Sequence, residues 1–179
     1  MTLLSATLLT AFVLVILGAF FIANHPRVRK RAICLLRSDR AAIIVLAVAT
    51  VWFLFKVTQW GPADFGDYKH FAFVVFLALA ILSWYFLKDF LIVRAGAILI
   101  LMAAHALLNA AYMHYEQPGR LFLVSFVYAM IVLALYFGTV PYRMRDLLEW
   151  LFAVPLRARC FGAVCAVYGL ILFGATFSY

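Results

Sequence analysis

The sequence predicts an all-α integral membrane protein: a bundle of about six membrane-spanning helices and one amphipathic helix at the cytoplasmic surface. Three observations lead to this prediction. Of the 179 residues, 69% are hydrophobic and 12% are charged, whereas soluble domains are about half apolar and about a quarter charged. Six apolar runs of near-membrane length follow one another along the chain. The connections between the runs carry basic residues on alternate sides, which is the pattern of a polytopic membrane protein.

So much apolar surface needs lipid as its solvent, because a globule of this size could not hide it. At roughly 20 residues for each span, six spans and their connections account for residues 1–179. We therefore expect a single transmembrane domain. Within hydrocarbon each backbone N–H group must find its acceptor inside its own segment, so the runs are expected to be helices.

The first run covers roughly residues 3–23 and is followed by the basic cluster His-Pro-Arg-Val-Arg-Lys-Arg at residues 25–31. A secretory signal peptide carries its basic region before the apolar stretch. The order is reversed here, so we expect a permanent helix whose N-terminus lies outside. The second and third runs, roughly residues 41–57 and 70–87, are bordered by Lys56 and Lys69, whose long side chains can reach the headgroups.

The fourth run, roughly residues 91–113, contains the candidate intramembrane polar site, His105 and Asn109. These residues are four apart and therefore share one face of a helix. Placing a polar side chain within a membrane costs free energy, so we expect each such residue to have a hydrogen-bonding partner or a function. Two interpretations remain open: the pair bonds to a neighbouring helix, or it lines a path for a proton or a solute. The run also contains Ala106 and Ala110, a small-residue pair that permits close helix packing.

The run from His105 to Asn109 resembles the His-x-x-x-Asn element of the rhomboid proteases, over five residues. The Gly-x-Ser-Gly nucleophile motif of that family is missing, and no histidine follows His114 to act as a base. A serine without its base is inert. The sequence therefore does not support this family, and we predict no catalytic residue.

Two further groups of residues contain side chains that can bind a haem or a metal ion. A haem needs a second histidine at a similar depth, and counting along the third and fourth runs puts His70 about 6–7 Å from the depth of His105. No motif supports this pairing, so no cofactor is predicted and haem held by His70 and His105 stays an alternative. An outer-face polar cluster could gather carboxylates and imidazoles that suit a cation, but its spacing matches no ligand pattern and no metal is predicted. Its members are Asp64, Asp67, His70, His114 and Glu116.

The fifth run covers roughly residues 121–140, and an amphipathic segment follows at residues 142–154. Apolar residues recur there at helical spacing on one side, and charged residues take the other, which predicts an interfacial helix. Arg145 and Glu149 are spaced for an ion pair. The segment is either a connector or a docking surface presented by Arg143, Arg145 and Trp150. Its apolar side is expected to consist of Met144, Leu147, Leu148 and Leu151.

The sixth run covers roughly residues 160–177, and Gly162 and Ala166 form a small-residue pair in it. Such a pair predicts tight packing within the chain or against another protomer, without deciding which. Of the 15 Lys and Arg residues, only Lys56, Lys69 and Arg120 fall on the side opposite the first basic connection. That bias places the basic side in the cytoplasm and both termini outside, and we expect an inner cell membrane.

The basic first connection is expected to contact anionic lipid headgroups and not nucleic acid, because it is short and lacks interleaved aromatic residues. No motif identifies a reaction, a solute or a cofactor. Short connections favour a non-enzymatic subunit of a larger membrane complex, or a homo-oligomeric, channel-like assembly. A small transporter or permease, with His105 and Asn109 lining its path, is the first alternative. A redox subunit that binds haem or quinone is the second.

Overall fold

The computed structural model describes residues 2–23, 34–36, 38–61, 66–86 and 89–178. Within these ranges the chain is helical and contains no strand. Six helices are long and apolar enough to cross a membrane: α1 (Leu3–Ala23), α3 (Asp39–Thr58), α4 (Lys69–Phe86), α5 (Leu91–Ala111), α6 (Arg120–Thr139) and α8 (Pro155–Ala175). The shorter α7 (Tyr142–Ala153) joins α6 to α8, and the 3-10 turns η2 (Gly66–Tyr68) and η3 (Thr176–Ser178) border α4 and α8. The predicted all-α membrane bundle is therefore confirmed.

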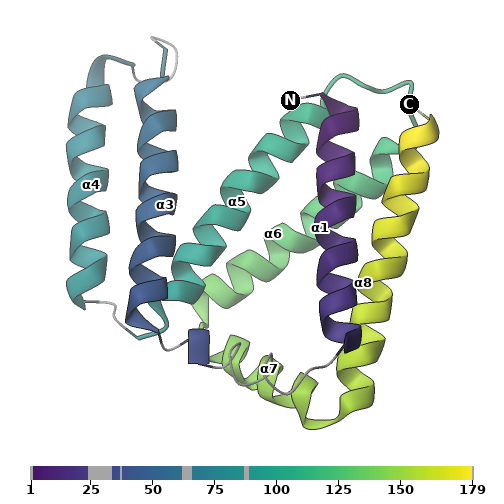
Figure 1. Ribbon diagram of the computed structural model, residues 1–179. Coiled ribbons are helices and arrows are strands. Elements are labelled where there is room, and N and C mark those ends of the chain that lie inside the picture. Colours follow the sequence, from purple (N-terminus) through teal and green to yellow (C-terminus); the bar gives the residue numbers. More distant parts are fainter. Residues whose placement is uncertain (1, 24–33, 37, 62–65, 87–88, 179) are drawn as a thin grey trace.

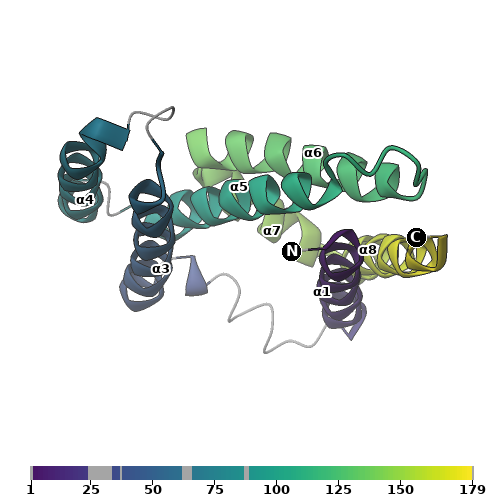
Figure 2. The same ribbon diagram turned by 90° about the horizontal axis from the view of Figure 1, so that it is seen from above.

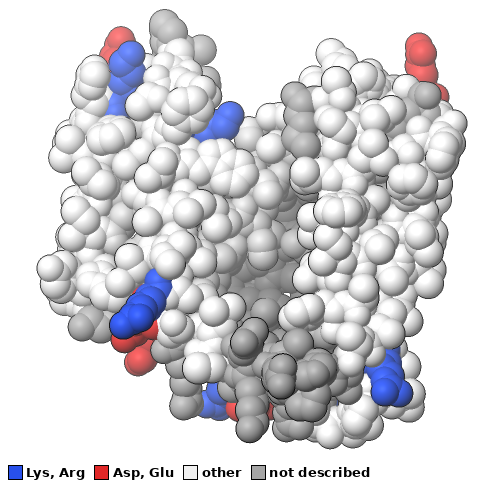
Figure 3. Space-filling model, viewed as in Figure 1, with Lys and Arg blue, Asp and Glu red and all other residues white. Residues whose placement is uncertain are grey.

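The six long helices run alternately up and down, so both chain termini lie at one end of the molecule (Figure 1). We call this end the terminal end and the opposite end, where α7 lies, the α7 end. Helices α3 and α4 form a hairpin on one side, α1 and α8 form a pair on the other, and α5 and α6 cross between them (Figures 1 and 2). In the view of Figure 1, the molecular surface is hollowed between the α3–α4 hairpin and the α1–α8 pair (Figure 3).

The tightest packing joins α1 to α8, the first and last spans, along most of their length. Gly18 of α1 and Gly162 of α8 meet so closely that a Cβ on either residue would lie 2.7 Å from a backbone oxygen of the other. Gly169 continues this seam against Ala11 and Leu14 of α1. Ala166 also lies against Gly18. The small-residue pair Gly162 and Ala166 therefore packs against α1 of the same chain, which was one of the two alternatives left open by the sequence.

A second, smaller cluster fixes α7 beneath the α1–α8 pair. Leu151 and Phe152 are buried there together with Ala158 of α8, and the ring of Phe152 stacks on Phe21 of α1 with 5.8 Å between centroids. Leu148 packs against the same cluster. Leu147, which the sequence placed on the apolar side, is 39% exposed, because the buried face is turned toward Phe152.

The span boundaries agree with the apolar runs except at the last helix. That helix was expected to begin near residue 160, yet α8 begins at Pro155. Proline is favoured in the first helical turn, where its missing N–H group costs no hydrogen bond. The helix therefore extends beyond the apolar run, with Arg157 and Arg159 in its first turns. Across the described residues the charged side chains lie toward the two ends, and the wide belt between them is uncharged on the face shown in Figure 3.

Candidate functional site

Helix α5 holds the centre of the molecule, since it contacts α6, α3 and α1. Small residues allow these approaches: Ala104 and Ala110 are buried, and a Cβ at Gly138 of α6 would lie only 3.2 Å from the Cβ of Ala97. The sequence placed this helix inside the bundle for the same reason, its content of small residues.

The candidate polar pair lies on the outside of this central helix. The side chains of His105 and Asn109 are 3.1 Å apart between Nε2 and Nδ2, a hydrogen-bonding distance, and both residues are exposed. Within the described part of the chain, this is the hydrogen bond that we find for either side chain. With the Asn109 amide donating to Nε2, the Nδ1–H group of His105 and the Oδ1 atom of Asn109 are left for an additional partner.

The side of α5 on which His105 and Asn109 lie follows from helical spacing. Ile98 lies seven residues before His105, nearly two full turns, and therefore on the same stripe of α5. Ile98 lines a crevice of about 280 Å³ whose other residues come from α3 and α4, including Phe53, Phe76 and Ser83. The pair continues this stripe toward the terminal end, where α3 and α5 diverge (Figure 1).

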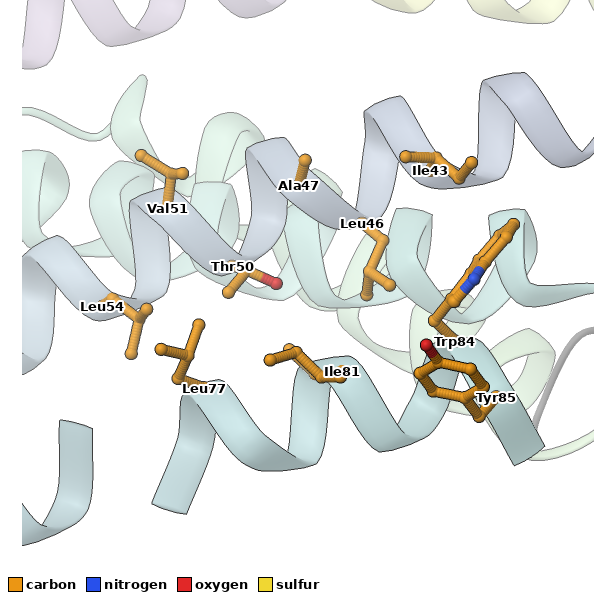
Figure 4. A pocket seen from close by; sticks show the side chains of 11 residues that line it. Ile43, Leu46, Ala47, Thr50, Val51, Leu54, Leu77, Ile81, Trp84 and Tyr85 are labelled. Atoms are coloured by element: carbon orange, nitrogen blue, oxygen red, sulfur yellow. The ribbon is translucent and has the colours of Figure 1, made fainter. Parts of the chain in front are cut away.

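The α3–α4 hairpin itself is weakly embedded. No residue of α4 is buried, and the helix packs on α3 and on η2 at its own start. Between α3 and α4 runs an apolar groove of about 490 Å³, into which Leu46, Leu54 and Leu77 project, with Trp84 and Tyr85 at one end (Figure 4). The sequence did not single out this groove, because it does not distinguish the apolar residues of a span that line a groove from those that face lipid.

The residues of the outer-face polar cluster are not brought together where they are described. Asp67 lies in η2 and His70 in the first turn of α4, whereas His114 and Glu116 lie in the α5–α6 connection. These two regions lie on opposite sides of the terminal end (Figure 1), and Asp64 lies outside the described residues. Among the described residues, no group of three or more metal-ligating side chains is found.

The two histidines of the haem alternative lie on different helices. His70 belongs to α4 and His105 to α5, and α3 contacts both helices and lies between them (Figure 2). Both histidines are exposed.

The three predicted docking residues of α7 have different surroundings. Arg143 is exposed beside Tyr142. Trp150 is 55% exposed and lies under the Arg157 guanidinium, with 4.6 Å between the Cζ atom and the ring centre. Arg145 is partly exposed, and it pairs with Asp146 at 3.2 Å and with Glu149 at 3.6 Å. The predicted Arg145–Glu149 ion pair is therefore confirmed.

Arg145 also lines a polar cavity of about 440 Å³ at the α7 end. The start of α3 contributes Ser38 and Asp39, and the start of α5 contributes Asp89 and Phe90. The sequence pattern does not single out these two aspartates as members of a site. Their position beside the first residue of each span was a signal that they share one membrane surface, but no spacing rule joined them to Arg145.

Comparison with known proteins finds no family model, no curated protein and no solved structure that matches this chain.

Proposed function

We propose that this chain is a non-enzymatic subunit of a membrane assembly, and that its partner is a second copy of itself. The observation that carries the proposal is the exposed His105–Asn109 pair on a membrane-spanning helix. Apolar residues that face outward are stable in lipid, but an imidazole and an amide with unused hydrogen-bonding groups are not. A neighbouring helix that supplies those bonds removes this cost.

A second copy has the chemistry that the pair needs. In a two-fold symmetric contact the same patch meets itself, so each group faces the corresponding groups of the partner. The Nδ1–H group of His105 is a donor and the Oδ1 atom of Asn109 is an acceptor. Two copies with the same orientation in the membrane, related by a two-fold axis along the membrane normal, therefore supply one donor and one acceptor to each other. The patch is self-complementary without any further residue.

The neighbouring surface supports the same role. Helix α4 has no buried residue, and the crevice beside Ile98 is lined by apolar and small hydroxyl side chains of α3 and α4. In a membrane, helices associate through close van der Waals contacts and interhelical hydrogen bonds instead of hydrophobic exclusion from water. An apolar crevice that leads along α5 to a polar pair offers both contributions to an incoming helix.

The proposal is tested by energy transfer between two differently labelled populations of the full chain, reconstituted in the same lipid vesicles and diluted with lipid. We expect transfer that survives dilution. Replacing His105 and Asn109 together by leucine is expected to weaken the association about tenfold, since each interhelical hydrogen bond contributes about 0.6 kcal/mol and at most about 1.7 kcal/mol.

Ser125 offers the matched control, because it is an exposed polar residue within α6 and lies outside the proposed contact. The Ser125→Leu variant is expected to associate like the parent chain. Transfer that disappears on dilution of the parent chain, or that is equally strong in the His105 and Asn109 double variant, would contradict the proposal.

A further inference from the structure

The polar cavity at the α7 end combines charges of both signs in one place. Asp39 and Asp89 line it from the starts of α3 and α5, and Arg145 lines it from α7. The cavity has a volume of about 440 Å³, and α3, α5 and α7, which are distant in the sequence, all contribute to its lining. Both ion pairs found among the described residues belong to Arg145, with Asp146 and Glu149, and neither involves the two cavity aspartates.

Arg145 still has hydrogen-bonding capacity in this position. Its Nη2 atom lies 3.2 Å from Oδ1 of Asp146, and its Nε atom lies 3.6 Å from Oε1 of Glu149. The guanidinium carries five N–H donors, and 36% of the side chain remains accessible. The accessible part of the guanidinium can therefore still donate hydrogen bonds to an anionic group in the cavity.

The cavity lies at the ends of two candidate membrane-spanning helices, where lipid headgroups are expected. Asp39 is the first residue of α3, and Leu91, which also lines the cavity, is the first residue of α5. Both helices cross the membrane from this point, and α7 lies at the same end with Trp150 exposed (Figure 1). Tryptophan is typical of the membrane interface.

We propose that this cavity binds a phosphoethanolamine group, the headgroup of phosphatidylethanolamine. The phosphate would accept hydrogen bonds from the Arg145 guanidinium, whose planar fork suits phosphate oxygens. The ammonium group would donate its three N–H bonds toward Asp39 and Asp89. A choline headgroup has no N–H donor, and a glycerol headgroup has no cation. The mixed charge of the cavity therefore selects a primary ammonium together with a phosphate.

The test is native mass spectrometry of the full chain in detergent, titrated with phosphatidylethanolamine, phosphatidylcholine or phosphatidylglycerol of identical acyl chains. We expect the first phosphatidylethanolamine to bind at least about tenfold more tightly than the other two lipids, since charge-assisted hydrogen bonds are the strong class. Equal binding of the three lipids, or tighter binding of phosphatidylglycerol, overturns the proposal.

Variants locate the site. Arg145→Gln and Asp89→Asn are each expected to abolish the preference, whereas Arg143→Gln, on the same helix but outside the cavity, is expected to keep it. If Arg145→Gln does not fold, Arg145→Lys keeps the charge but loses the planar fork, and it is expected to weaken the preference. An Arg143→Gln variant that loses the preference as fully as Asp89→Asn would show a diffuse surface effect and overturn the proposal.

Soluble phosphoethanolamine distinguishes the two sources of the group. Displacement of the lipid by the soluble compound would show that the polar group alone occupies the cavity. Selective lipid binding without displacement would show that the acyl chains contribute and that the intact lipid is the ligand. Both results support recognition of the phosphoethanolamine group.

Discussion

Gly162 has no side chain at the point where α8 crosses α1, and the crossing depends on this. A Cβ there would lie 2.7 Å from the Gly18 oxygen, 2.8 Å from the Ile22 nitrogen and 2.8 Å from the Phe21 Cβ. Two of these three atoms belong to the backbone, which cannot rotate away as a flexible side chain can. We therefore expect Gly162→Ala to lower the free energy of unfolding by about 1–3 kcal/mol, the usual range for overpacking.

Thermal unfolding in detergent, followed by size-exclusion chromatography of the remaining folded protein, measures this effect. Gly174 provides the control on the same helix, because a Cβ there would meet nothing within 4 Å. Alanine favours a helix over glycine by about 0.5–1 kcal/mol, so Gly174→Ala is expected to be neutral or slightly stabilising. Equal melting temperatures for the two variants would contradict the close crossing.

For His105 and Asn109, the sequence predicts that they share a helix face but not what that face contacts. Their spacing predicts a shared face, and their hydrogen-bonding distance of 3.1 Å agrees with it. Which neighbour that face meets depends on the rotation of α5 about its axis, and that rotation is set by Ala97 and Ala104 packing elsewhere. The exposure of the pair thus follows from contacts made by other residues of the same helix.

At the scale of elements, α7 is held chiefly by one aromatic side chain. Phe152 is 4% exposed and packs with Phe21, Leu151 and Ala158. Replacing Phe152 by alanine leaves a cavity between α7 and the α1–α8 pair. We expect the free energy of unfolding to fall by about 3–5 kcal/mol, the range for truncation of a buried phenylalanine. The loss of stability is expected mainly in α7.

Hydrogen exchange of the backbone amides measures this local loss. The amides of α7 are expected to exchange much faster in Phe152→Ala, while those of the α1–α8 seam keep most of their protection. Leu156→Ala is the control, because Leu156 is 68% exposed at the start of α8. Unchanged protection of α7 in Phe152→Ala would mean that other contacts hold the helix.

At the scale of the whole molecule, both termini lie at the same end (Figure 1). The basic residues of the described connections are more numerous at the α7 end, in α7 and the first turns of α8, and the positive-inside rule assigns such an end to the cytoplasm. We therefore expect the C-terminus to be non-cytoplasmic.

Alkaline phosphatase, which is active only outside the cytoplasm, tests this orientation as a C-terminal fusion. High phosphatase activity is expected for a fusion after the last residue and low activity for a fusion after Val154, between α7 and α8. A green fluorescent protein fused at the same two positions should give the opposite pattern of signals. The reverse result at both positions would place α7 outside the cell.

The sequence by itself determined the elements. Five of the six spans begin and end within two residues of their apolar runs, and α7 was predicted from its alternating polar and apolar sides. Lipid makes this possible, because a membrane-spanning segment must satisfy its backbone locally and be apolar along its whole length. Both requirements are properties of consecutive residues, so they can be recognised without knowing any tertiary contact.

Only the tertiary structure decided which faces meet. It packed Gly162 and Gly169 of α8 against α1 inside the chain, left His105 and Asn109 exposed, and brought Asp39, Asp89 and Arg145 around one cavity. Helices in a membrane are apolar on all sides, so no difference between a wet and a dry face marks the contact surface in advance. The choice depends on shape, and shape is shared between residues that are far apart in the chain.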